Sequence, residues 1–331
     1  MNVSVIVLAC NEEIHIRRCL EKVKPLSNQV LVVDCYSSDQ TVSMARQSGA
    51  QVFQNSWEGL YSRQFNWALD HLPIQTTWVL RLDADEYLSP ELVEEIKAKL
   101  DTLPDDVTGV SFYLRRVFMG RVIRRGMPRI KMIRLFRYGK ARCEQRLMDE
   151  HIELLEGRSV EFEGEFADHN LNDIGWWTAK HNGYALREAV DLLDLEYGLL
   201  SGLNAETQRR GDAGGSETTE DTEGTEKGEN VGGARTLELP CGLEGQAAEK
   251  RAKKMRYARL PLFWRAFAYF CFRYFLRGGF LEGKEGFLWH FLQGWWYRTL
   301  VDAKVFEIKR ESGGDRDRML ALLRGKYGMK I

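Results

Sequence analysis

The 331-residue sequence has no long apolar run, no excess of either charge and no cysteine pattern typical of a zinc site. Its 47 basic and 48 acidic side chains argue against a general nucleic-acid-binding protein, because such proteins carry a basic excess. No uncharged apolar run reaches the ~18 residues of a transmembrane helix. The opening MNVSVIVLAC also lacks the basic region of a signal peptide, so we expect neither secretion nor a membrane span.

The six cysteines include no CxxC pair, which makes a structural zinc site unlikely on spacing alone. Cys10, Cys19 and Cys35 lie within apolar segments. We therefore expect these three to be buried and reduced. That expectation fits a cytosolic, reducing compartment.

The first hundred residues alternate between strand and helix patterns. Residues 3–9 and 30–34 are continuous β-branched runs, typical of strands buried on both faces. Helical spacing follows each of them, and strands at 51–53 and 78–82 continue the series. Alternating elements of this kind predict an α/β fold with a parallel sheet.

The pattern changes between residues 110 and about 166. Short alternating runs at 110–114, 131–136 and 160–162 predict an antiparallel extension of the sheet, and residues 173–200 predict a helix. Residues 204–235 contain seven Gly, eight Asp or Glu and no aromatic residue, so we interpret them as a disordered insert.

The segment after the insert is basic and then aromatic. Residues 257–306 hold 17 of the chain's 37 aromatic side chains. On a helical wheel, Arg259, Arg265, Arg273 and Arg277 share one arc, opposite an aromatic face. Such a helix can lie on an anionic membrane; a core helix with snorkelling arginines, or a subunit interface, are the alternatives.

Polar side chains follow three strands of the predicted sheet. Asn11 and Glu12 follow the first strand, Asp34 ends the second, and Asp83 and Asp85 follow the strand at 78–82. The carboxyl ends of parallel strands meet at one edge, where such sheets bind ligands. These residues therefore predict a binding site.

Asp83 and Asp85 are separated by one residue, so on an extended segment both carboxylates face one side. Mg²⁺ or Mn²⁺ binds through one or two carboxylates together with substrate phosphates, which predicts a metal–diphosphate site. The alternative is a helix cap, but Ser89 and Pro90 already supply a helix start. At the second strand, Asp34 is a candidate for contact with a base, whereas Asp39 fits a helix cap.

VIVLACNEE, VLVVDCYSSDQT and WVLRLDADE, in that order, resemble family 2 glycosyltransferases with the GT-A fold. WEGLYSRQFNWALDHL, HNGYALREAVDLL and GGFLEGKEGFLWHFLQGWWY are similar to the lipopolysaccharide-core or surface-polysaccharide type of that family. The resemblance covers most of the chain outside the insert. One departure is Tyr36, where the family more often has glycine.

The resemblance implies a Rossmann-like, mainly parallel sheet flanked by helices, and a nucleotide-sugar donor, commonly a UDP-sugar. Asn11 and Glu12 would line the nucleoside pocket, Asp34 would meet the base, and Asp83 would contact ribose or metal. Asp85 would coordinate Mg²⁺ or Mn²⁺ on the diphosphate. The resemblance also implies that Gln64 and Asn66 bind the nucleotide-sugar.

Transfer with inversion needs a base that takes the proton of the acceptor hydroxyl. Related enzymes carry an acidic residue after the antiparallel extension, which here corresponds to Glu150, with Asp149 as a rival. The alternative is that Asp149 and His151 pair with arginines. His169 is a further candidate contact to metal or phosphate, and it can equally be structural.

Five arginines between residues 115 and 125 can grip a phosphorylated acceptor or the donor diphosphate, or can form a solvated face. We predict a GT-A domain at 1–170, a helical segment at 171–203, an insert at 204–247 and a membrane-associating region at 248–331. The predicted protein is a metal-dependent glycosyltransferase at the inner face of the cytoplasmic membrane, acting on a lipid-linked or polysaccharide acceptor.

Two rival functions remain at this point. A sugar-1-phosphate nucleotidyltransferase uses a similar sheet, but it would need a glycine-rich phosphate loop, and ACNEEIHIR contains no glycine. A degenerate, membrane-tethered nucleotide-sugar-binding module is the second rival.

Overall fold

The structure is a computed structural model that describes residues 2–27, 29–145, 150–200 and 256–329. The chain divides into two compact units, Met1–Asp191 with Leu260–Lys304, and Leu192–Arg259 with Val305–Ile331. The predicted insert at 204–247 lies outside the described residues. Within the described ranges, no helix combines the length and the apolar character needed to cross a bilayer.

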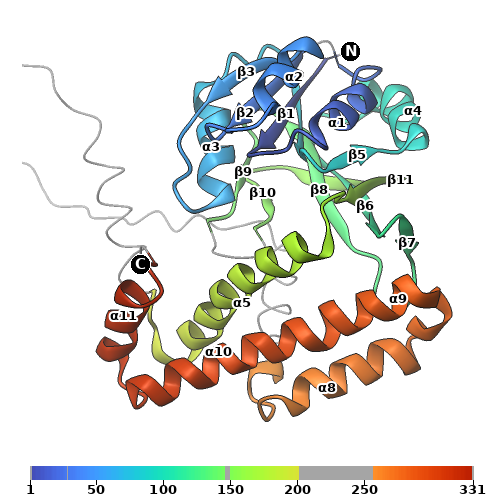
Figure 1. The fold of residues 1–331 in the computed structure, drawn as a ribbon. Coiled ribbons are helices and arrows are strands. Elements are labelled where there is room, and N and C mark those ends of the chain that lie inside the picture. The colour runs from blue at the N-terminus through green and yellow to red at the C-terminus, as the bar shows by residue number, and fades with distance from the viewer. Residues whose placement is uncertain (1, 28, 146–149, 201–255, 330–331) are drawn as a thin grey trace, which may run out of the picture. The chain divides into compact units, whose positions relative to one another are not determined.

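The first unit is built around a mixed sheet of nine described strands (Figure 1). In the order in which they pair, the strands are β3 (Gln51–Gln54), β2 (Gln29–Asp34), β1 (Val3–Ala9), β4 (Trp78–Asp83), β8 (Lys131–Arg137), β6 (Val107–Phe118), β11 (Arg158–His169) and β5 (Glu86–Leu88), and β7 (Arg121–Ile123) pairs with β6. A separate antiparallel pair is formed by β9 (Ala141–Cys143) and β10 (Ile152–Leu154).

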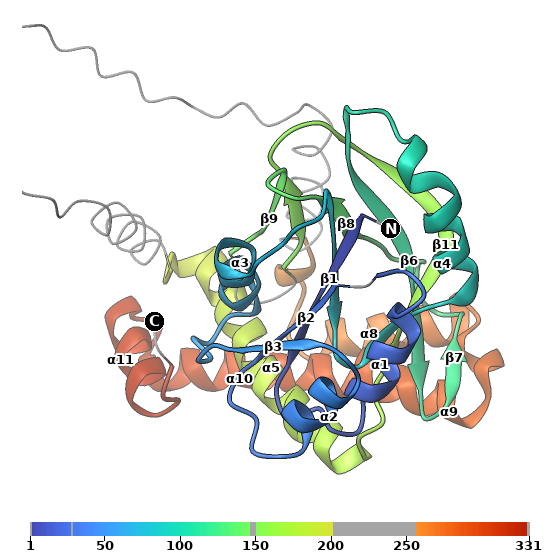
Figure 2. The same cartoon turned by 90° about the horizontal axis from the view of Figure 1, so that it is seen from above.

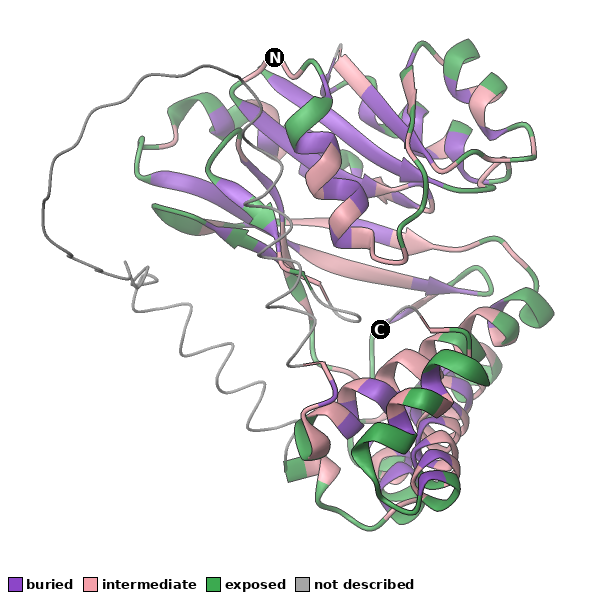
Figure 3. Cartoon of the chain, turned by 90° about the vertical axis from the view of Figure 1, so that its left-hand side faces the viewer, coloured by how far each residue is buried: buried purple, intermediate pink, exposed green. Residues whose placement is uncertain are grey.

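β1 is the centre of the parallel part of the sheet. It runs parallel to β2 and β4, with Val5 opposite both Val30 and Leu80. All of its residues are buried, as Figure 3 shows in purple, and this explains its apolar sequence on both faces. Figure 2 shows α1 (Ile16–Val23) and α2 (Thr41–Gln47) on one side of β1 and α3 (Tyr61–His71) on the other. The predicted α/β class is confirmed.

The predicted antiparallel extension is also confirmed, with one difference. β8 runs antiparallel to β4 and β6, and β5 runs antiparallel to β11. β11, which contains the run at 160–162, pairs parallel to β6, so the antiparallel prediction is wrong for this pair. Alternation along a strand determines which side chains share a face, but it does not determine the direction of the neighbouring strand.

α4 (Pro90–Lys99) begins as the sequence predicts. The Ser89 Oγ accepts a hydrogen bond from the Leu92 N–H at 3.2 Å, and Pro90 occupies the first turn. Neither Asp83 nor Asp85 therefore caps this helix, which leaves the metal hypothesis in place. At α2, the Asp39 Oδ1 accepts from the Thr41 N–H at 2.9 Å.

The C-terminal half of the described chain is helical. Its elements are α5 (Ile174–Tyr197), α8 (Trp264–Cys271), η2 (Phe272–Leu276), η3 (Gly279–Glu282), α9 (Gly283–Trp289), η4 (His290–Trp296), α10 (Tyr297–Ser312) and α11 (Arg316–Gly325). Earlier in the chain, the short 3₁₀ turn η1 (Leu100–Thr102) follows α4. In the second unit, Ile308, Met319 and Leu323 are buried, and Lys326 pairs with Glu307 at 3.0 Å.

The prediction of an outward basic stripe is wrong for two of its four arginines. Arg265 is 3% exposed and Arg273 is 2% exposed, whereas Trp264 is 73% exposed and Leu276 is 79% exposed. Arg265 and Arg273 are eight residues apart and share one helix face, as the wheel groups them, but that face is buried, and Arg265 pairs there with Asp302 of α10. A helical wheel groups side chains by face and does not tell which face packs inward. The helix therefore buries arginines and exposes aromatic and aliphatic side chains.

Candidate functional site

A cavity of about 1140 Å³ opens at the carboxyl ends of β1 and β4. Pockets for one small ligand usually measure roughly 300–1,000 Å³, so this cavity has room for more than one ligand. The turn between β4 and β5 lines one part of it, and α5 and η4 line another. The position agrees with the binding edge that the sequence predicts.

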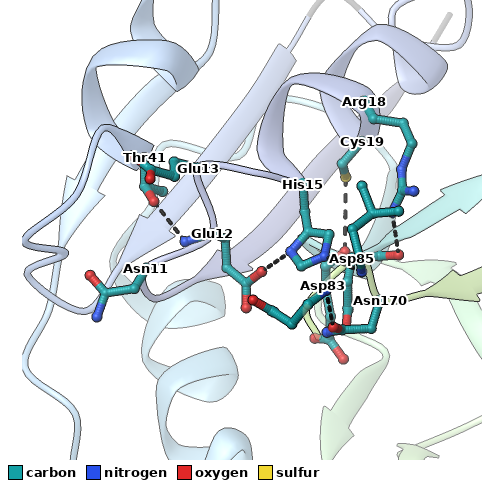
Figure 4. A network of polar contacts seen from close by, with 12 residues as sticks. Asn11, Glu12, Glu13, His15, Arg18, Cys19, Thr41, Asp83, Asp85 and Asn170 are labelled. Atoms are coloured by element: carbon teal, nitrogen blue, oxygen red, sulfur yellow. Dashed lines mark hydrogen bonds and ion pairs between the residues drawn. The ribbon is translucent and has the colours of Figure 1, made fainter. Parts of the chain in front are cut away.

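Four of the predicted acidic residues line the cavity, namely Glu12, Asp83, Asp85 and Glu150. Figure 4 shows the side chains of Glu12, Asp83 and Asp85 gathered on one side, whereas the side chain of Asn11 points away from them. Glu12 comes from the loop after β1, Asp83 and Asp85 come from the end of β4 and the turn that follows it, and Glu150 comes from the segment before β10. We call these four residues the acidic cluster.

Glu12 is held in place by its neighbours. Its N–H donates to the Thr41 Oγ1 at 2.7 Å, and its carboxylate is hydrogen-bonded to the His15 Nδ1. The His15 Nε2 accepts from the Leu171 N–H at 2.8 Å, so Nδ1 carries the proton and donates to Glu12. One buried imidazole thus connects the loop after β1 to the segment before α5.

Asp83 has an unpaired acceptor. Its Oδ1 is buried and has no hydrogen-bond partner among the described residues; the Arg81 Nη2 lies 3.8 Å away, beyond hydrogen-bonding distance. The Asp85 Oδ2 accepts from the Asn170 Nδ2 at 3.0 Å. A buried carboxylate oxygen without a partner is a feature that usually has an explanation, such as an absent ion.

These two carboxylates fit a hard divalent cation. In the part of the chain that the structure describes, no group of three His, Cys, Asp or Glu side chains forms a complete metal site. Mg²⁺ and Mn²⁺ do not need one when substrate phosphates supply the other ligands. Asp83 and Asp85 are therefore the residues that could hold such an ion.

Behind the acidic cluster lies a buried ion pair that the sequence analysis did not identify. The Glu86 Oε2 accepts from the Asp83 N–H at 3.0 Å, and its other oxygen pairs with the Arg134 Nη2 at 2.5 Å. Burial raises the pKa of the Glu86 carboxyl, and the charge of Arg134 opposes this rise. The pair fixes the backbone of the turn that carries Asp83.

Three predicted donor residues are not among the residues that line the cavity: Asn11, Asp34 and Asn66. Asp34 is fully buried and accepts from the Ser37 N–H at 2.9 Å and from the Gln54 Nε2 at 3.2 Å. Asn66 bonds the backbone of Cys143 in both directions, at 2.9 Å each. Asp34 and Asn66 thus hold neighbouring segments of the chain together, and their contact with a ligand stays a prediction.

Gln64 does line the cavity, and it is hydrogen-bonded to Asn55 at 2.9 Å. Tyr36 adopts a φ of 60°, in the left-handed region that favours glycine. The sequence therefore departs from the family pattern at Tyr36, and the backbone there keeps a conformation suited to glycine.

The expectation of three reduced, buried cysteines is wrong for two of them. Cys10 and Cys35 form a disulfide, and Cys10 is exposed, whereas Cys19 is free and buried. Cys10 and Cys35 directly follow β1 and β2, so their apolar neighbours do not bury them. Both line the cavity, and the bond joins the two loops at this edge of the sheet.

Glu150 is the one described candidate for the base, because Asp149 lies outside the described residues. It lines the cavity and is close enough to buried Arg81 to influence the pKa of that guanidinium. His151 lies 3.7 Å from the Glu144 carboxylate rather than beside an arginine. His169 lines the cavity, and its Nδ1 lies 3.3 Å from the Tyr87 hydroxyl.

Sequence reasoning missed the contribution of α5. Lys180, His181, Tyr184 and Arg187 all line the cavity from this helix. Their spacing of three and four residues was the available signal, since it places them on one helix face. Of the arginines between 115 and 125, Arg116 alone is among the lining residues.

Lys180 faces the acidic cluster. Burial by itself lowers the pKa of Lys180, but Tyr61 and the carboxylates of Asp85, Glu12 and Asp83 together raise it. The ammonium group is therefore charged at neutral pH, within electrostatic reach of the predicted metal–diphosphate site.

The geometry is that of an α/β ligand-binding domain with its cavity at the carboxyl ends of parallel strands. Residues 4–151 match the family model described as glycosyl transferase family 2.

The curated relatives are similar over part of their length. An uncharacterized glycosyltransferase of Rickettsia typhi is 40% identical over 95 residues, which are 29% of this chain and 32% of that protein. One from Rickettsia bellii is 38% identical over 95 residues, 29% of this chain and 31% of the relative. The chain thus spans about a third of the length of these relatives.

Two solved structures are similar at a lower level. Residues 1–349 of S. aureus TarS give a TM-score of 0.38 at 18% identity, covering 59% of this chain and 66% of that one. Glucosyl-3-phosphoglycerate synthase from Mycobacterium tuberculosis, in complex with Mn²⁺, UDP and glucosyl-3-phosphoglycerate, gives a TM-score of 0.28 at 24% identity, covering 34% and 44%.

Proposed function

We propose that this protein is a glycosyltransferase that moves a sugar from a UDP-sugar to a hydroxyl group of an acceptor, with inversion at the anomeric carbon. The observation that carries the proposal is the acidic cluster, in which Glu12, Asp83 and Asp85 stand at the carboxyl ends of β1 and β4 and Glu150 lines the same cavity, within the residues 4–151 that match the glycosyl transferase family 2 model. Asn11, Glu12, Asp34, Gln64, Asn66 and Asp83 are the proposed donor-binding residues.

Asp83 and Asp85 would hold Mg²⁺ or Mn²⁺, which when bound neutralises charge on the diphosphate leaving group. Lys180 adds a second positive charge on the same side of the cavity. The bound metal ion and Lys180 would thus stabilise the negative charge of the leaving diphosphate. In a partly enclosed site this electrostatic stabilisation is stronger than in water.

Glu150 is the proposed base, with Asp149 as the rival. The acceptor hydroxyl gives its proton to the carboxylate while its oxygen bonds to the anomeric carbon, and the bond from that carbon to the diphosphate breaks. Removing such a base lowers turnover by about 10²–10⁴-fold.

The test is a transfer assay with a panel of UDP-sugars in Mn²⁺, scoring UDP release. We expect Glu150→Gln to lower turnover by at least about 100-fold while UDP still binds. Glu94→Gln, at an exposed position of α4, is the matched control. If Asp149→Asn abolishes transfer and Glu150→Gln does not, the base is Asp149. Release of pyrophosphate would identify a nucleotidyltransferase, and UDP binding without turnover would identify a binding module.

We further propose that the acceptor is lipid-linked, of lipopolysaccharide or polysaccharide type, and that the protein works at the cytoplasmic face of an anionic membrane. Support comes from an exposed apolar face on the first unit, which includes Trp264, Phe275, Leu276, Phe280 and Leu281. Single exposed apolar residues are ordinary, but a contiguous face has a partner.

Exposed basic residues in the same segments favour a lipid surface as that partner. Arg277 and Lys284 are exposed beside it. The N–H groups of Arg124 and Arg125 donate to the Glu282 Oε1 at 3.1 and 2.7 Å, which places this exposed arginine loop against η3. Apolar side chains within a basic rim bind membranes that contain anionic lipid.

Vesicle co-sedimentation tests this part of the proposal. We expect binding to phosphatidylglycerol vesicles and not to phosphatidylcholine vesicles. Phe275→Ser with Leu276→Ser should weaken binding by about 100-fold or more, because each substitution removes roughly 1.5–3 kcal/mol of apolar burial. Leu155→Ser, an exposed leucine outside the patch, is the control. Equal binding of all variants would contradict the membrane assignment.

A further inference from the structure

The cavity has a second part whose charge is opposite to that of the acidic cluster. Arg116, Arg187 and Arg298 line it from β6, α5 and α10. Two carboxylates oppose them: Asp168 lies 3.6 Å from the Arg116 Nε, and Glu188 pairs with Arg298. We call these three arginines, with the lining aromatics Trp177 and Tyr184, the basic subsite.

Arg187 is the cation with spare charge in this subsite. No hydrogen bond or ion pair joins it to a carboxylate of the residues that the structure describes; its guanidinium lies over the Tyr184 ring, 5.8 Å from the centroid. Arg187 is seven residues beyond Lys180 on one face of α5, a distance of about 10 Å along the helix axis. The acidic cluster, which Lys180 faces, and the basic subsite are thus separated by roughly the length of a sugar ring and its substituents.

A third observation is the crowding of positive charge behind the lining. Buried Arg273 has its pKa lowered, first by burial and then in part by the charges of Arg298 and Arg116. Its Nε and Nη2 make no hydrogen bond within the described residues. Clustered guanidinium groups of this kind are stabilised when an anion binds among them.

The subsite also offers surfaces that suit a sugar. The His181 ring stacks on Trp177 with centroids 3.5 Å apart, and its Nδ1 donates to the Trp177 carbonyl oxygen at 2.8 Å. Burial lowers the pKa of His181 to about 4, so its Nε2 is an unprotonated acceptor for a hydroxyl. Trp289 adds a second aromatic ring, 6.3 Å from Trp177.

From these contacts we propose that the basic subsite binds the acceptor sugar through an anionic substituent, a phosphate or a carboxylate, held by Arg187 with Arg116 and Arg298. The proposal rests on the proposed function, because it assigns the acceptor half of the same cavity. It makes the acceptor an acidic sugar rather than a neutral one.

The test measures sugar binding by calorimetry, on protein that already contains UDP and Mn²⁺. The probes are glucose 6-phosphate, glucuronate and glucose. We expect the phosphorylated sugar, the acidic sugar or both to bind at least about tenfold more tightly than glucose, and the two anionic probes to show which substituent is preferred. Equal binding of all three, or binding of none, would overturn the proposal.

Variants locate the effect. Arg187→Gln should lower the affinity for the anionic probe by about tenfold, and Arg187→Lys should lower it less because the positive charge is kept. Both variants should bind UDP as the wild type does. Arg17→Gln, an exposed arginine of α1 outside the cavity, should change nothing. If Arg187→Gln binds the anionic probe normally, or loses UDP as well, the assignment of Arg187 fails.

If a variant does not fold, a measurement on the wild type tests the basic subsite instead. Added salt should lower the affinity of the protein for the anionic probe and leave its affinity for glucose unchanged, because salt screens only charged contacts. Salt-independent binding of both would count against the proposal. Failure of the wild type to bind UDP would instead overturn the proposed function itself.

Discussion

The Arg265–Asp302 ion pair offers the sharpest test of how the exposed helix face is held. Both side chains are buried, 2% and 1% exposed. The Arg265 Nε donates to the Asp302 Oδ1 at 2.7 Å, and the Phe263 N–H donates to Oδ2 at 2.7 Å. One carboxylate thus holds an arginine in the first turn of α8 and the backbone at the start of that helix.

Asp302→Ala leaves the buried Arg265 guanidinium without this carboxylate. Breaking a buried pair lowers stability by about 3–5 kcal/mol, and the lost acceptor for the Phe263 N–H adds about 1 kcal/mol. We therefore expect the free energy of unfolding to fall by about 4–6 kcal/mol. Asp302→Asn keeps an acceptor for that N–H and removes the charge, so its loss should be smaller.

The assay is equilibrium unfolding in urea, with the free energy of unfolding extrapolated to water. The double variant Arg265→Met with Asp302→Leu replaces the pair by apolar side chains and should lie within about 1 kcal/mol of the wild type. A loss below about 1 kcal/mol for Asp302→Ala, or a double variant as unstable as the single one, would refute the reasoning.

Three further predictions concern stability. Gly126→Ala should lower the free energy of unfolding by about 2–4 kcal/mol, because φ is +79° and the new Cβ would lie 2.2 Å from an imidazole carbon of η4; Gly139→Ala, with the same φ and open space, isolates the backbone part in thermal melts. Replacing Cys10 and Cys35 by Ser should lower the free energy of unfolding by about 3.5 kcal/mol for a separation of 25 residues. A reductant should lower the melting temperature of the wild type but not that of the variant. Burial lowers the pKa of His181 to about 4, so the stability of the neutral ring is present above the unfolded value of about 6.5 and is lost as pH falls toward 4. Urea titrations should show the wild type losing about 3 kcal/mol more than His181→Gln over that range, and equal losses would contradict the assignment.

The sequence was sufficient where local chemistry determines the structure. The β-branched runs around Val5 and Val32 predicted the parallel strands because a fully buried strand needs apolar side chains on both faces. The spacing of Asp83 and Asp85 predicted two carboxylates at one edge because both follow the same strand. Ser89 predicted a helix start because its side chain caps the backbone within one turn.

Features that depend on distant packing could not be predicted in this way. Arg265 and Arg273 face inward because Arg265 pairs with Asp302, which is 37 residues further along the chain, and a helical wheel does not tell which face of a helix packs inward. Arg187 and Lys180 reach the cavity because α5 packs along it, and helical spacing alone does not say which face meets the ligand. Cys10 and Cys35 are 25 residues apart, and their pairing follows from the adjacent strands β1 and β2.

The most direct measurement is the thermal stability of the protein with UDP, with Mn²⁺ and with both. The account predicts that UDP and Mn²⁺ together stabilise the wild type, by about 2.7 kcal/mol at 100 times the Kd. Asp85→Asn should lose that shift, and Asp101→Asn, an exposed aspartate of η1, should keep it. A shift that is the same without Mn²⁺, or the same in Asp85→Asn, would contradict the central claim that this cavity binds a metal–nucleotide diphosphate.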